Sequence, residues 1–315
     1  MYNLNNSVKA ATRDGFGKAI LQLGEHNKDI YVLSASVGDS TRAFNFKEKF
    51  PDRYIEAGIA EASMIGLSCG LALGGKIPFP TSFATFLPGR CYDQIRQSVC
   101  YSNLNVKLVA THAGLTVGAD GATHQMMEDI AMLRALPNLT IIIPCDSLEA
   151  EKATIAVAKM KGPCYLRLGR EKTPVFTMQN TPFEIGKAVT LREGKDVTII
   201  STGFMVYYAL IAAESLQNEG ISARVVNMHT IKPIDRETII KAARETKVIV
   251  TAEEHQIYGG LGSAVAEVVV QNHPVPMRII GMKDQFGESG KPSELMIKYG
   301  LSVQEIIDAV KSLIQ

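Results

Sequence analysis

The chain has 315 residues, of which 46% are hydrophobic and 21% charged, a globular composition that is long enough for two domains. Its formal net charge of +1 and its 7% aromatic content argue against nucleic acid or a membrane surface as the main partner. Five scattered cysteines without metal-ligand spacing indicate reduced thiols and a cytoplasmic protein.

In the first half of the chain, short apolar segments alternate with helical patterns. The predicted strands are 30–36, 106–112, 139–145 and 164–169. The predicted helices are 12–24, 61–74, 89–103, 126–136 and 147–160. Asp146 precedes the last helix as its N-cap, with Glu149 three residues later. Because the strands are continuous apolar runs, we expect a mostly parallel sheet covered by helices on both faces.

This pattern breaks at 172–190, where prolines and polar residues predict a linker. The alternation then resumes with strands at 196–202, 223–228 and 247–252 and helices at 204–219, 235–245 and 262–271. The sequence therefore predicts an α/β protein with two domains, at 1–171 and 191–315, each built on a helix-covered, mostly parallel sheet.

Polar residues follow several predicted strands of the first domain. His112 ends one strand, Arg170 follows another, and the stretch "SASVGDS" follows a third. Ligands of open α/β sheets bind beyond the carboxyl ends of the strands, so these residues and Arg13 would form an anion pocket at one edge. A sugar phosphate is the natural ligand of such a pocket. Solvation, or pairing with a local acid, is the competing interpretation for each arginine.

Glu61 begins a predicted helix of small and apolar residues. Its carboxylate either complements the positive end of the helix dipole or is a buried functional acid. Phe83 and Phe86 stand three residues apart in "SFATF" and either pack in the core or line a site for a flat heterocycle. The sequence pattern alone leaves these alternatives open.

The stretch "YGGLGSAVAE" resembles a dinucleotide-binding loop only in part. Its glycines at 259, 260 and 262 lack a third at the required offset, and no acidic residue follows on a strand about 20 residues later. We therefore interpret it as close packing between a loop and a helix.

Several motifs, taken in order, resemble the transketolase family, specifically the C-terminal half of a transketolase divided between two chains. "GIAEASM" resembles the segment around the cofactor glutamate, "SFATF" the aromatic pocket, and "THAGLTVGADGATHQ" the substrate loop. "ATR", "LRLGRE", "VVNMHTIKPID" and "EEHQIYGGLGSAVAE" extend the resemblance over nearly the whole chain. The resemblance implies a pyrimidine-binding domain followed by the family's C-terminal domain.

The resemblance also implies a role for each candidate residue. Glu61 would hydrogen-bond the pyrimidine ring of thiamine diphosphate, which Phe83 and Phe86 would line. Glu61 and His124 would be catalytic, with His124 acting on a hydroxyl or carbonyl of the substrate. The implied substrate-binding residues are Arg13, Ser40, His112, Asp120, His124 and Arg170. Among these, Asp120 would recognise a hydroxyl and the arginines a phosphate.

The sequence departs from the family pattern in two places. Where an aspartate is usual, "SASVGDS" has Ser34 and Ser36, with Asp39 out of register. Ala62 stands where His or Gln is usual. These departures bear on which sugar phosphates the site would accept.

The family binds the diphosphate and its Mg²⁺ through a G-D-G…N-type segment in its other half, and this sequence lacks that segment. The chain therefore resembles half an active site, with no metal ligands of its own. The resemblance implies homodimerisation and a partner subunit that carries the diphosphate site, in a tetramer of two copies of each.

Three functional hypotheses follow. The leading one is a subunit that transfers a two-carbon ketol unit between sugar phosphates, as in the pentose phosphate pathway. The β subunit of a 2-oxo acid dehydrogenase has the same two-domain plan but would bind a carboxylate, and the set of His112, Asp120, His124 and Arg170 argues against it. A non-catalytic homodimeric relative of the fold is the third, and the retained Glu61 argues against it.

Overall fold

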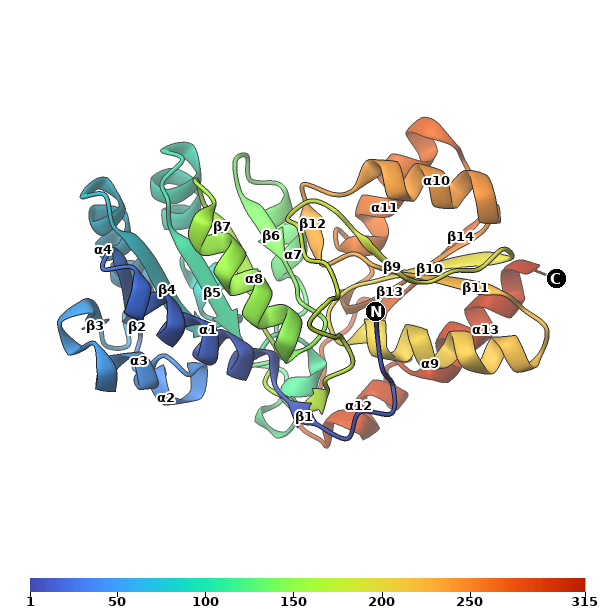
Figure 1. The fold of residues 1–315 in the computed structure, drawn as a ribbon, viewed down its shortest axis with the longest axis horizontal. Helices are drawn as coiled ribbons and strands as arrows, with labels where there is room; N and C mark the ends of the chain where they lie inside the picture. Colours follow the sequence, from blue (N-terminus) through green and yellow to red (C-terminus); the bar gives the residue numbers. More distant parts are fainter. Residues whose placement is uncertain (315) are drawn as a thin grey trace.

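Two sheets organise the part of the chain that the computed structural model describes, residues 1–314 (Figure 1). The first sheet has seven strands in the order β12-β6-β7-β5-β4-β2-β3, all parallel to their neighbours except β12. Its strands are β2 (Ile30–Ser34), β3 (Tyr54–Glu56), β4 (Ile77–Phe83), β5 (Lys107–Thr111), β6 (Thr140–Ile142), β7 (Cys164–Arg167) and β12 (Thr230–Lys232).

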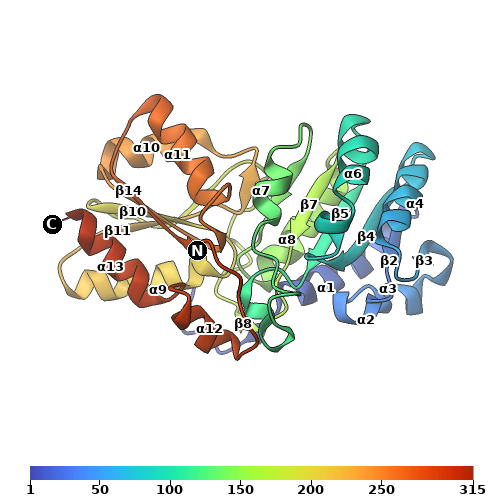
Figure 2. The ribbon, with the colours of Figure 1, turned by 180° about the vertical axis from the view of Figure 1, so that it is seen from behind.

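Helices cover both faces of this sheet. One face packs on α1 (Thr12–His26) and α8 (Ser147–Lys159), which lie side by side in front of the strands in Figure 1. The other packs on α4 (Glu61–Leu73) and on the helical segments of 87–101, in front in Figure 2. Neighbouring strand residues such as Val32 and Leu33 therefore enter separate cores, which explains the continuous apolar runs.

The second sheet has five strands in the order β14-β13-β10-β11-β9, parallel except for β9. Its strands are β9 (Val189–Arg192), β10 (Val197–Ser201), β11 (Ala223–Asn227), β13 (Ile249–Gln256) and β14 (Met277–Met282). Helices α9 (Met205–Asn218) and α13 (Val303–Ile314) pack on one face, and α10 (Arg236–Thr246) and α11 (Leu261–Asn272) on the other. The core under α10 and α11 is continuous with the core of the first sheet, so the two halves share a packed seam.

Shorter elements complete the chain. Around the first sheet are α2 (Gly38–Thr41), α3 (Phe44–Lys49), α5 (Leu87–Arg90), α6 (Tyr92–Gln94) and α7 (Asp129–Arg134), and α12 (Pro292–Lys298) follows the second sheet. Pro51–Arg53 and Leu115–Asp120 form 3₁₀ turns, and Ile95–Tyr101 forms a π-helix. Within residues 1–314, none of the helices is both long enough and apolar enough to span a membrane.

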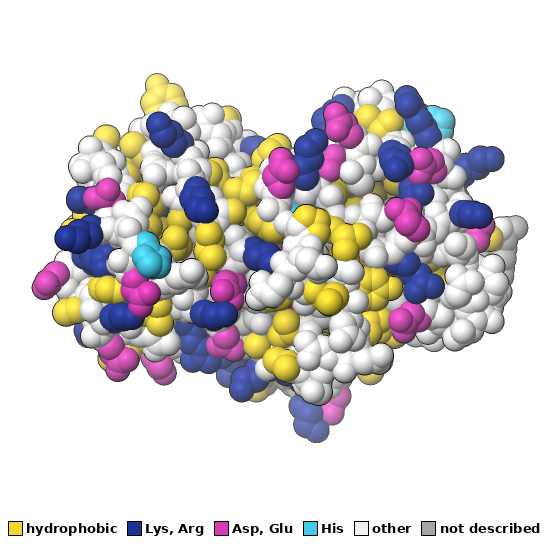
Figure 3. All heavy atoms as spheres, viewed as in Figure 1, with side chains coloured by type: hydrophobic (Ala, Val, Ile, Leu, Met, Phe, Trp, Pro, Cys, Tyr) yellow, Lys and Arg dark blue, Asp and Glu magenta, His cyan; other side chains and the backbone are white. Residues whose placement is uncertain are grey.

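Charged side chains of both signs are mixed on the surface. On the face drawn in Figure 3, basic and acidic side chains alternate over both halves of the molecule, with apolar side chains between them. This face thus carries no extended basic stripe, as the net charge of +1 leads one to expect.

The α/β fold with mostly parallel, helix-covered sheets is confirmed. Helices α1, α4 and α8 begin at their predicted residues, and the Asp146 side chain accepts the Glu149 N–H at 2.9 Å as the predicted cap. The predicted helix at 89–103 is wrong as one helix, because the chain forms α5, α6 and a π-helix in turn. The predicted helix at 126–136 shrinks to α7, since the backbone of Met126 and Met127 bonds other segments instead.

Strand β4 was not predicted from the sequence, and it contains Pro78 and Pro80, which are unusual in a central strand. Its ladder with β5 begins only at Thr81, so the proline-containing part has a single neighbouring strand, β2. A missing N–H is tolerated at such a position, as it is on a sheet edge.

The segment at 172–190 is held against the first half of the chain. Strand β8 (Thr173–Pro174) pairs antiparallel with β1 (Lys9–Ala10). The Lys152 ammonium donates to the carbonyl oxygens of Met178 and Thr181 at 2.8 and 2.7 Å. These contacts tie the segment to α8 and to the N-terminal strand.

Candidate active site

The predicted site residues come from separate elements that end at one edge of the first sheet. Ser40 lies on α2 after β2, Phe83 ends β4, His112 follows β5 and Arg170 follows β7, while Arg13 lies in the first turn of α1. Because β2, β4, β5 and β7 are parallel neighbours, their carboxyl ends meet at this edge.

His112 is buried beside Arg13, whose Nη1 lies 3.3 Å from His112 Nε2 and donates to the Ser40 carbonyl at 2.8 Å. Arginine can only donate, so Nε2 is the accepting nitrogen and Nδ1 carries the proton, which it donates to Thr111 Oγ1 at 2.7 Å. Burial, followed by the Arg13 and Arg170 charges, lowers the pKa of His112 to about 3. His112 is therefore neutral at physiological pH, with a fixed tautomer.

Four rings stand together beside this pair. Phe83 stacks on His112 at a centroid distance of 3.8 Å, and Phe86 stacks on Phe83 at 5.7 Å. His124 lies edge-on to both phenylalanines, 5.5 Å from Phe86 and 6.5 Å from Phe83. The structure thus brings both histidines and both phenylalanines to one place, where the two phenylalanines are only half-buried.

Asp120 and Arg170 form an ion pair at 2.9 Å, with about a third of each side chain exposed (35% and 38%). Arg170 Nη1 also donates to the Val117 carbonyl at 3.1 Å. The charges of both residues act on the pKa of His112, Arg170 lowering it and Asp120 raising it. The pair therefore lies in the same electrostatic neighbourhood as His112 and adds a charged rim to the ring cluster.

Glu61 is the first residue of α4, and its side chain is only 5% exposed. The N-cap residue Ala60 makes no side-chain cap, so the helix dipole acts on an anion placed there. The ion-pair partner of Glu61 is Arg90, with Nη1 3.3 Å from Oε2 and the guanidinium 4.3 Å above the Phe86 ring. The structure therefore places Glu61 both at the helix terminus and out of solvent, and its functional role stays a prediction.

Arg90 was missed by sequence reasoning, although it lies in the stretch "PGRCYDQIR" directly after the aromatic motif. Only its position after Phe86 could have indicated it, because nothing in the spacing connects it to α4. In the structure Arg90 joins the acid to the aromatic rings.

The residues that depart from the family pattern lie in different surroundings. Ser34 is buried, and its Oγ accepts the Val37 N–H at 3.3 Å in the turn after β2. Ser36 is exposed with a φ of 57°, and its N–H donates to Glu56 at 2.8 Å. Asp39 and Ala62 are exposed. Ser34 is thus part of a local turn, whereas Ser36 is held to the end of β3.

The glycine-rich stretch at 258–267 packs closely against its own chain. The N–H groups of Leu261 and Gly262 at the start of α11 donate to Glu253, at 2.6 and 2.8 Å. A Cβ on Gly260 would collide with the same carboxylate. The helix end that a dinucleotide phosphate would use is thus filled by Glu253, as close packing requires.

The residues fit the pyrimidine end of thiamine diphosphate, the cofactor that the sequence resemblance implies. Glu61 offers a buried carboxylate, and the half-buried Phe83 and Phe86 offer flat apolar faces. Arg90 contacts both Glu61 and the Phe86 ring, which places the acid close to the rings. For the other end of the cofactor, no group of three or more His, Cys, Asp or Glu that could hold a metal ion occurs within residues 1–314.

Comparison with known proteins gives matches along the chain. Residues 8–175 match the model of the transketolase pyrimidine binding domain, and residues 186–306 that of the transketolase C-terminal domain. The 6-deoxy-6-sulfo-D-fructose transketolase subunit SqwH of Clostridium sp. (strain MSTE9) is 42% identical over 94% of this chain and 92% of its own length. An apulose-4-phosphate transketolase subunit of Phocaeicola vulgatus is 40% identical over 96% of both chains.

A solved structure described as "Split gene transketolase, inactive beta4 tetramer" superposes with a TM-score of 0.91 at 46% identity. The match covers 96% of this chain and 98% of that one. The similarity in fold therefore covers both sheets of this chain.

Proposed function

The chain belongs to the transketolase family, and we propose that it is the C-terminal subunit of a two-chain, thiamine diphosphate-dependent transketolase. In this proposal it transfers a two-carbon ketol unit between sugar phosphates. The observation that carries the proposal is the joint presence of a buried helix-terminal acid, stacked aromatic rings and an arginine–histidine cluster at one sheet edge.

When bound, thiamine diphosphate supplies the group that carries the two-carbon unit from donor to acceptor. Glu61 would hold a proton shared with the ring nitrogen of the pyrimidine, and its burial would keep water away from that bond. Phe83 and Phe86 would line the ring and orient it. Arg90 must move off Glu61 or share it, because its guanidinium lies against the carboxylate and over Phe86.

The arginine–histidine cluster binds the charged end of the substrate. Arg13 and Arg170 supply charge-assisted donors to a tetrahedral anion, and the half-buried Ser40 adds a hydroxyl. His112, held neutral, offers a polar ring without adding a third positive charge to those of Arg13 and Arg170. Two relatives are named for a sulfonated and a phosphorylated sugar, whose anionic groups are both tetrahedral.

Asp120 and His124 act on the sugar chain itself. Asp120 accepts a hydrogen bond from a substrate hydroxyl, while Arg170 keeps its carboxylate oriented. His124 moves a proton at the hydroxyl or carbonyl next to the reacting carbon, and the Thr123 hydroxyl 2.9 Å from its Nδ1 orients the ring.

The diphosphate and its Mg²⁺ are held mainly by a partner subunit, and a second copy of this chain packs alongside. Helix α4 offers a surface for such contacts: it forms a groove of about 750 Å³ with the glycines at 66, 70 and 74. Leu67 and Leu73 on this helix are 48% and 76% exposed, and Ile59 just before it is 81% exposed. Apolar side chains this exposed and this close together mark an interaction surface.

Calorimetric titration with thiamine diphosphate and Mg²⁺ tests the proposal. The purified chain should bind the cofactor weakly, and the co-expressed pair of subunits should bind it tightly and transfer ketol units between ketose phosphates. Tight binding or transfer by this chain alone would show that the half-site proposal is wrong. Decarboxylation of 2-oxo acids by the pair, without ketol transfer, would favour the dehydrogenase alternative.

A further inference from the structure

The loop that joins β5 to α7 carries Asp120 and His124 and begins beside His112. Three glycines with left-handed φ values direct its path: Gly114 (89°), Gly118 (77°) and Gly121 (79°). Its regular structure is the 3₁₀ turn at Leu115–Asp120. A loop of this length without an α-helix or strand of its own depends on outside contacts for a single conformation.

Some of these contacts come from β13 in the second half of the chain. Glu254 Oε1 accepts the Thr116 N–H at 2.6 Å, although 138 residues separate the two. A Cβ on Gly114 would collide with the same carboxylate, so the loop passes directly over it. Glu254 is 8% exposed, and burial raises the pKa of its carboxyl.

Others come from the segment that leads into α12, which packs against the 3₁₀ turn. Ser289 Oγ donates to the Ala119 carbonyl at 2.6 Å, next to Asp120. The Glu288 carbonyl accepts from Gln125 Nε2 at 2.9 Å, next to His124. Asp120 and His124 are therefore each adjacent in sequence to a residue that is hydrogen-bonded to the second half of the chain.

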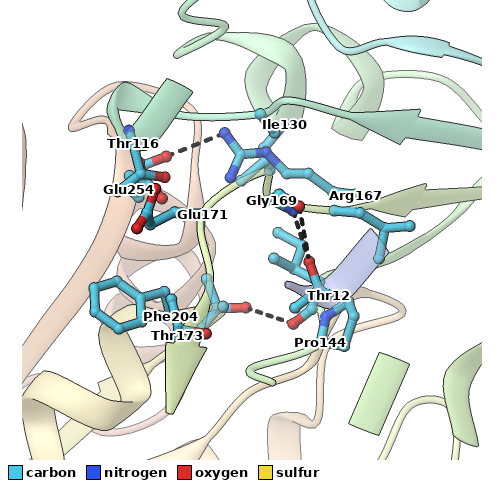
Figure 4. A pocket seen from close by; sticks show the side chains of 15 residues that line it. Thr12, Thr116, Ile130, Pro144, Arg167, Gly169, Glu171, Thr173, Phe204 and Glu254 are labelled. Carbon is cyan, nitrogen blue, oxygen red and sulfur yellow. Dashed lines mark hydrogen bonds between the residues drawn. The ribbon is translucent and has the colours of Figure 1, made fainter. Parts of the chain in front are cut away.

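Glu254 is itself held in place. Its backbone carbonyl accepts Arg167 Nη2 at 3.1 Å, drawn as a dashed line in Figure 4. Thr116, Arg167 and Glu254 border a cavity of about 30 Å³ at the seam (Figure 4). A cavity of this size holds a water molecule or two and no substrate, so it is not a second binding site.

We infer that Glu254 and Ser289 are positioning residues that fix the substrate loop, and that this is how the second half of the chain serves the active site. None of the predicted site residues belongs to this half. Through Thr116 and Ala119, these two side chains set where Asp120 stands, and the neighbouring Glu288 carbonyl holds Gln125 beside His124. The inference rests on the proposed function for its catalytic readout, but its structural readout is independent of it.

Hydrogen exchange followed by mass spectrometry on the purified chain measures the loop directly. Glu254→Ala should speed exchange in residues 113–125 by about tenfold, because the buried Thr116 N–H loses its acceptor. Glu254→Gln keeps an acceptor oxygen and should retain most of the protection. Ser289→Ala should speed exchange by a few-fold, and Ser293→Ala, an exposed serine on α12, should leave it unchanged.

In the reconstituted enzyme, Glu254→Ala should raise KM for the sugar phosphate by about tenfold, because misplaced loop residues bind it less well. Deuterium exchange at cofactor C2 should stay within about twofold of the unmutated rate, because Glu61 lies outside the loop.

Unchanged loop exchange in both Glu254→Ala and Ser289→Ala would overturn the inference. So would an equal loss of C2 exchange and transfer in Glu254→Ala, because that pattern means general loss of the fold. If the unmutated enzyme transfers no ketol unit, the proposed function fails, and hydrogen exchange still decides whether the loop is held from the second half.

Discussion

Arg167 is the last residue of β7, and Arg170 follows it three residues later. Each arginine pairs with an aspartate at nearly the same distance. Arg167 Nε lies 2.8 Å from Asp129 with the two side chains 6% and 0% exposed. Arg170 Nη1 lies 2.9 Å from Asp120 with the side chains 38% and 35% exposed. Equal geometry in different surroundings suits these pairs to different tasks: the first holds the seam, and we propose that the second binds substrate.

The seam pair makes hydrogen bonds to several other elements, although Asp129 Oδ1 has no partner within residues 1–314. Asp129 also accepts the Tyr165 hydroxyl at 2.7 Å, and Arg167 Nη2 donates to the carbonyls of Met126 and Glu254 at 3.1 Å. Burial alone would raise the pKa of Asp129, but Arg167 outweighs it and holds that pKa below its usual value. This network binds β7, α7 and β13 into one unit, and it is buried away from solvent.

The site pair is unsaturated. Arg170 uses Nη1 for Asp120 and for the Val117 carbonyl, and its Nε and Nη2 make no hydrogen bond within residues 1–314. Free guanidinium donors at an exposed edge suit a bidentate contact with a phosphate or sulfonate. Partner count and burial, more than distance, distinguish the structural pair of Arg167 and Asp129 from the pair that we propose for substrate binding.

The largest effect is expected at Glu61, the buried acid on the site side of the comparison. Glu61→Ala should slow deuterium exchange at cofactor C2 in the reconstituted complex by about 10²–10⁴-fold, the usual contribution of acid–base catalysis. Its melting temperature should stay close to that of the unmutated chain, because Arg90 is 54% exposed and can be solvated alone. Exchange at the unmutated rate, measured by NMR, would remove Glu61 from the mechanism.

The seam should respond in stability. Asp129→Ala leaves Arg167 buried without its counter-ion, which should lower the free energy of unfolding by about 3–5 kcal/mol. Asp120→Ala, the matched change in the exposed pair, should lower it by at most about 1 kcal/mol. Urea titration of both variants measures the difference, and equal losses would contradict the division of tasks between the two pairs.

The site pair should respond in substrate binding. Arg170→Ala and Arg13→Ala should each raise KM for phosphorylated sugars by about 10–100-fold, the value of a charge-assisted contact, with little change for unphosphorylated analogues. Arg96→Ala is the control, because Arg96 is exposed and lies outside the cluster. Equal effects on both classes of sugar would make the two arginines structural.

The sequence was sufficient to predict where the site residues meet, because parallel strands place their carboxyl ends at one edge. His112 and Arg170 follow the parallel strands β5 and β7, and both act at this edge, where Arg13 lies 3.3 Å from His112. The starts of α1, α4 and α8 were also predictable, since helix periodicity and an acidic N-cap such as Asp146 are local signals.

The remaining features depend on contacts between distant segments that leave no local pattern. Strand β12 comes from the second half and pairs antiparallel with β6 at the edge of the first sheet. The Arg90–Glu61 pair joins residues 29 apart, and the Glu254–Thr116 bond joins residues 138 apart. In each case the residue types are compatible with many partners, and tertiary packing alone selects one.

The smallest effect concerns pH and gives the two regions opposite signs. The pKa of His112 is lowered from 6.5 to about 3, so the unfolded chain binds more protons between these values and acid removes stability. Burial raises the pKa of Glu253, at the seam, from 4.5 to about 7, so the folded chain binds more protons in that range and stability is lost as pH rises through 7. When the pH is lowered from 6.5 to 5, the free energy of unfolding should fall by about 1–2 kcal/mol less in His112→Asn than in the unmutated chain. In Glu253→Gln it should fall by more than in the unmutated chain. Urea unfolding of both variants at the two pH values measures these changes. A change of the same sign in both variants would contradict the opposite pKa shifts of His112 and Glu253.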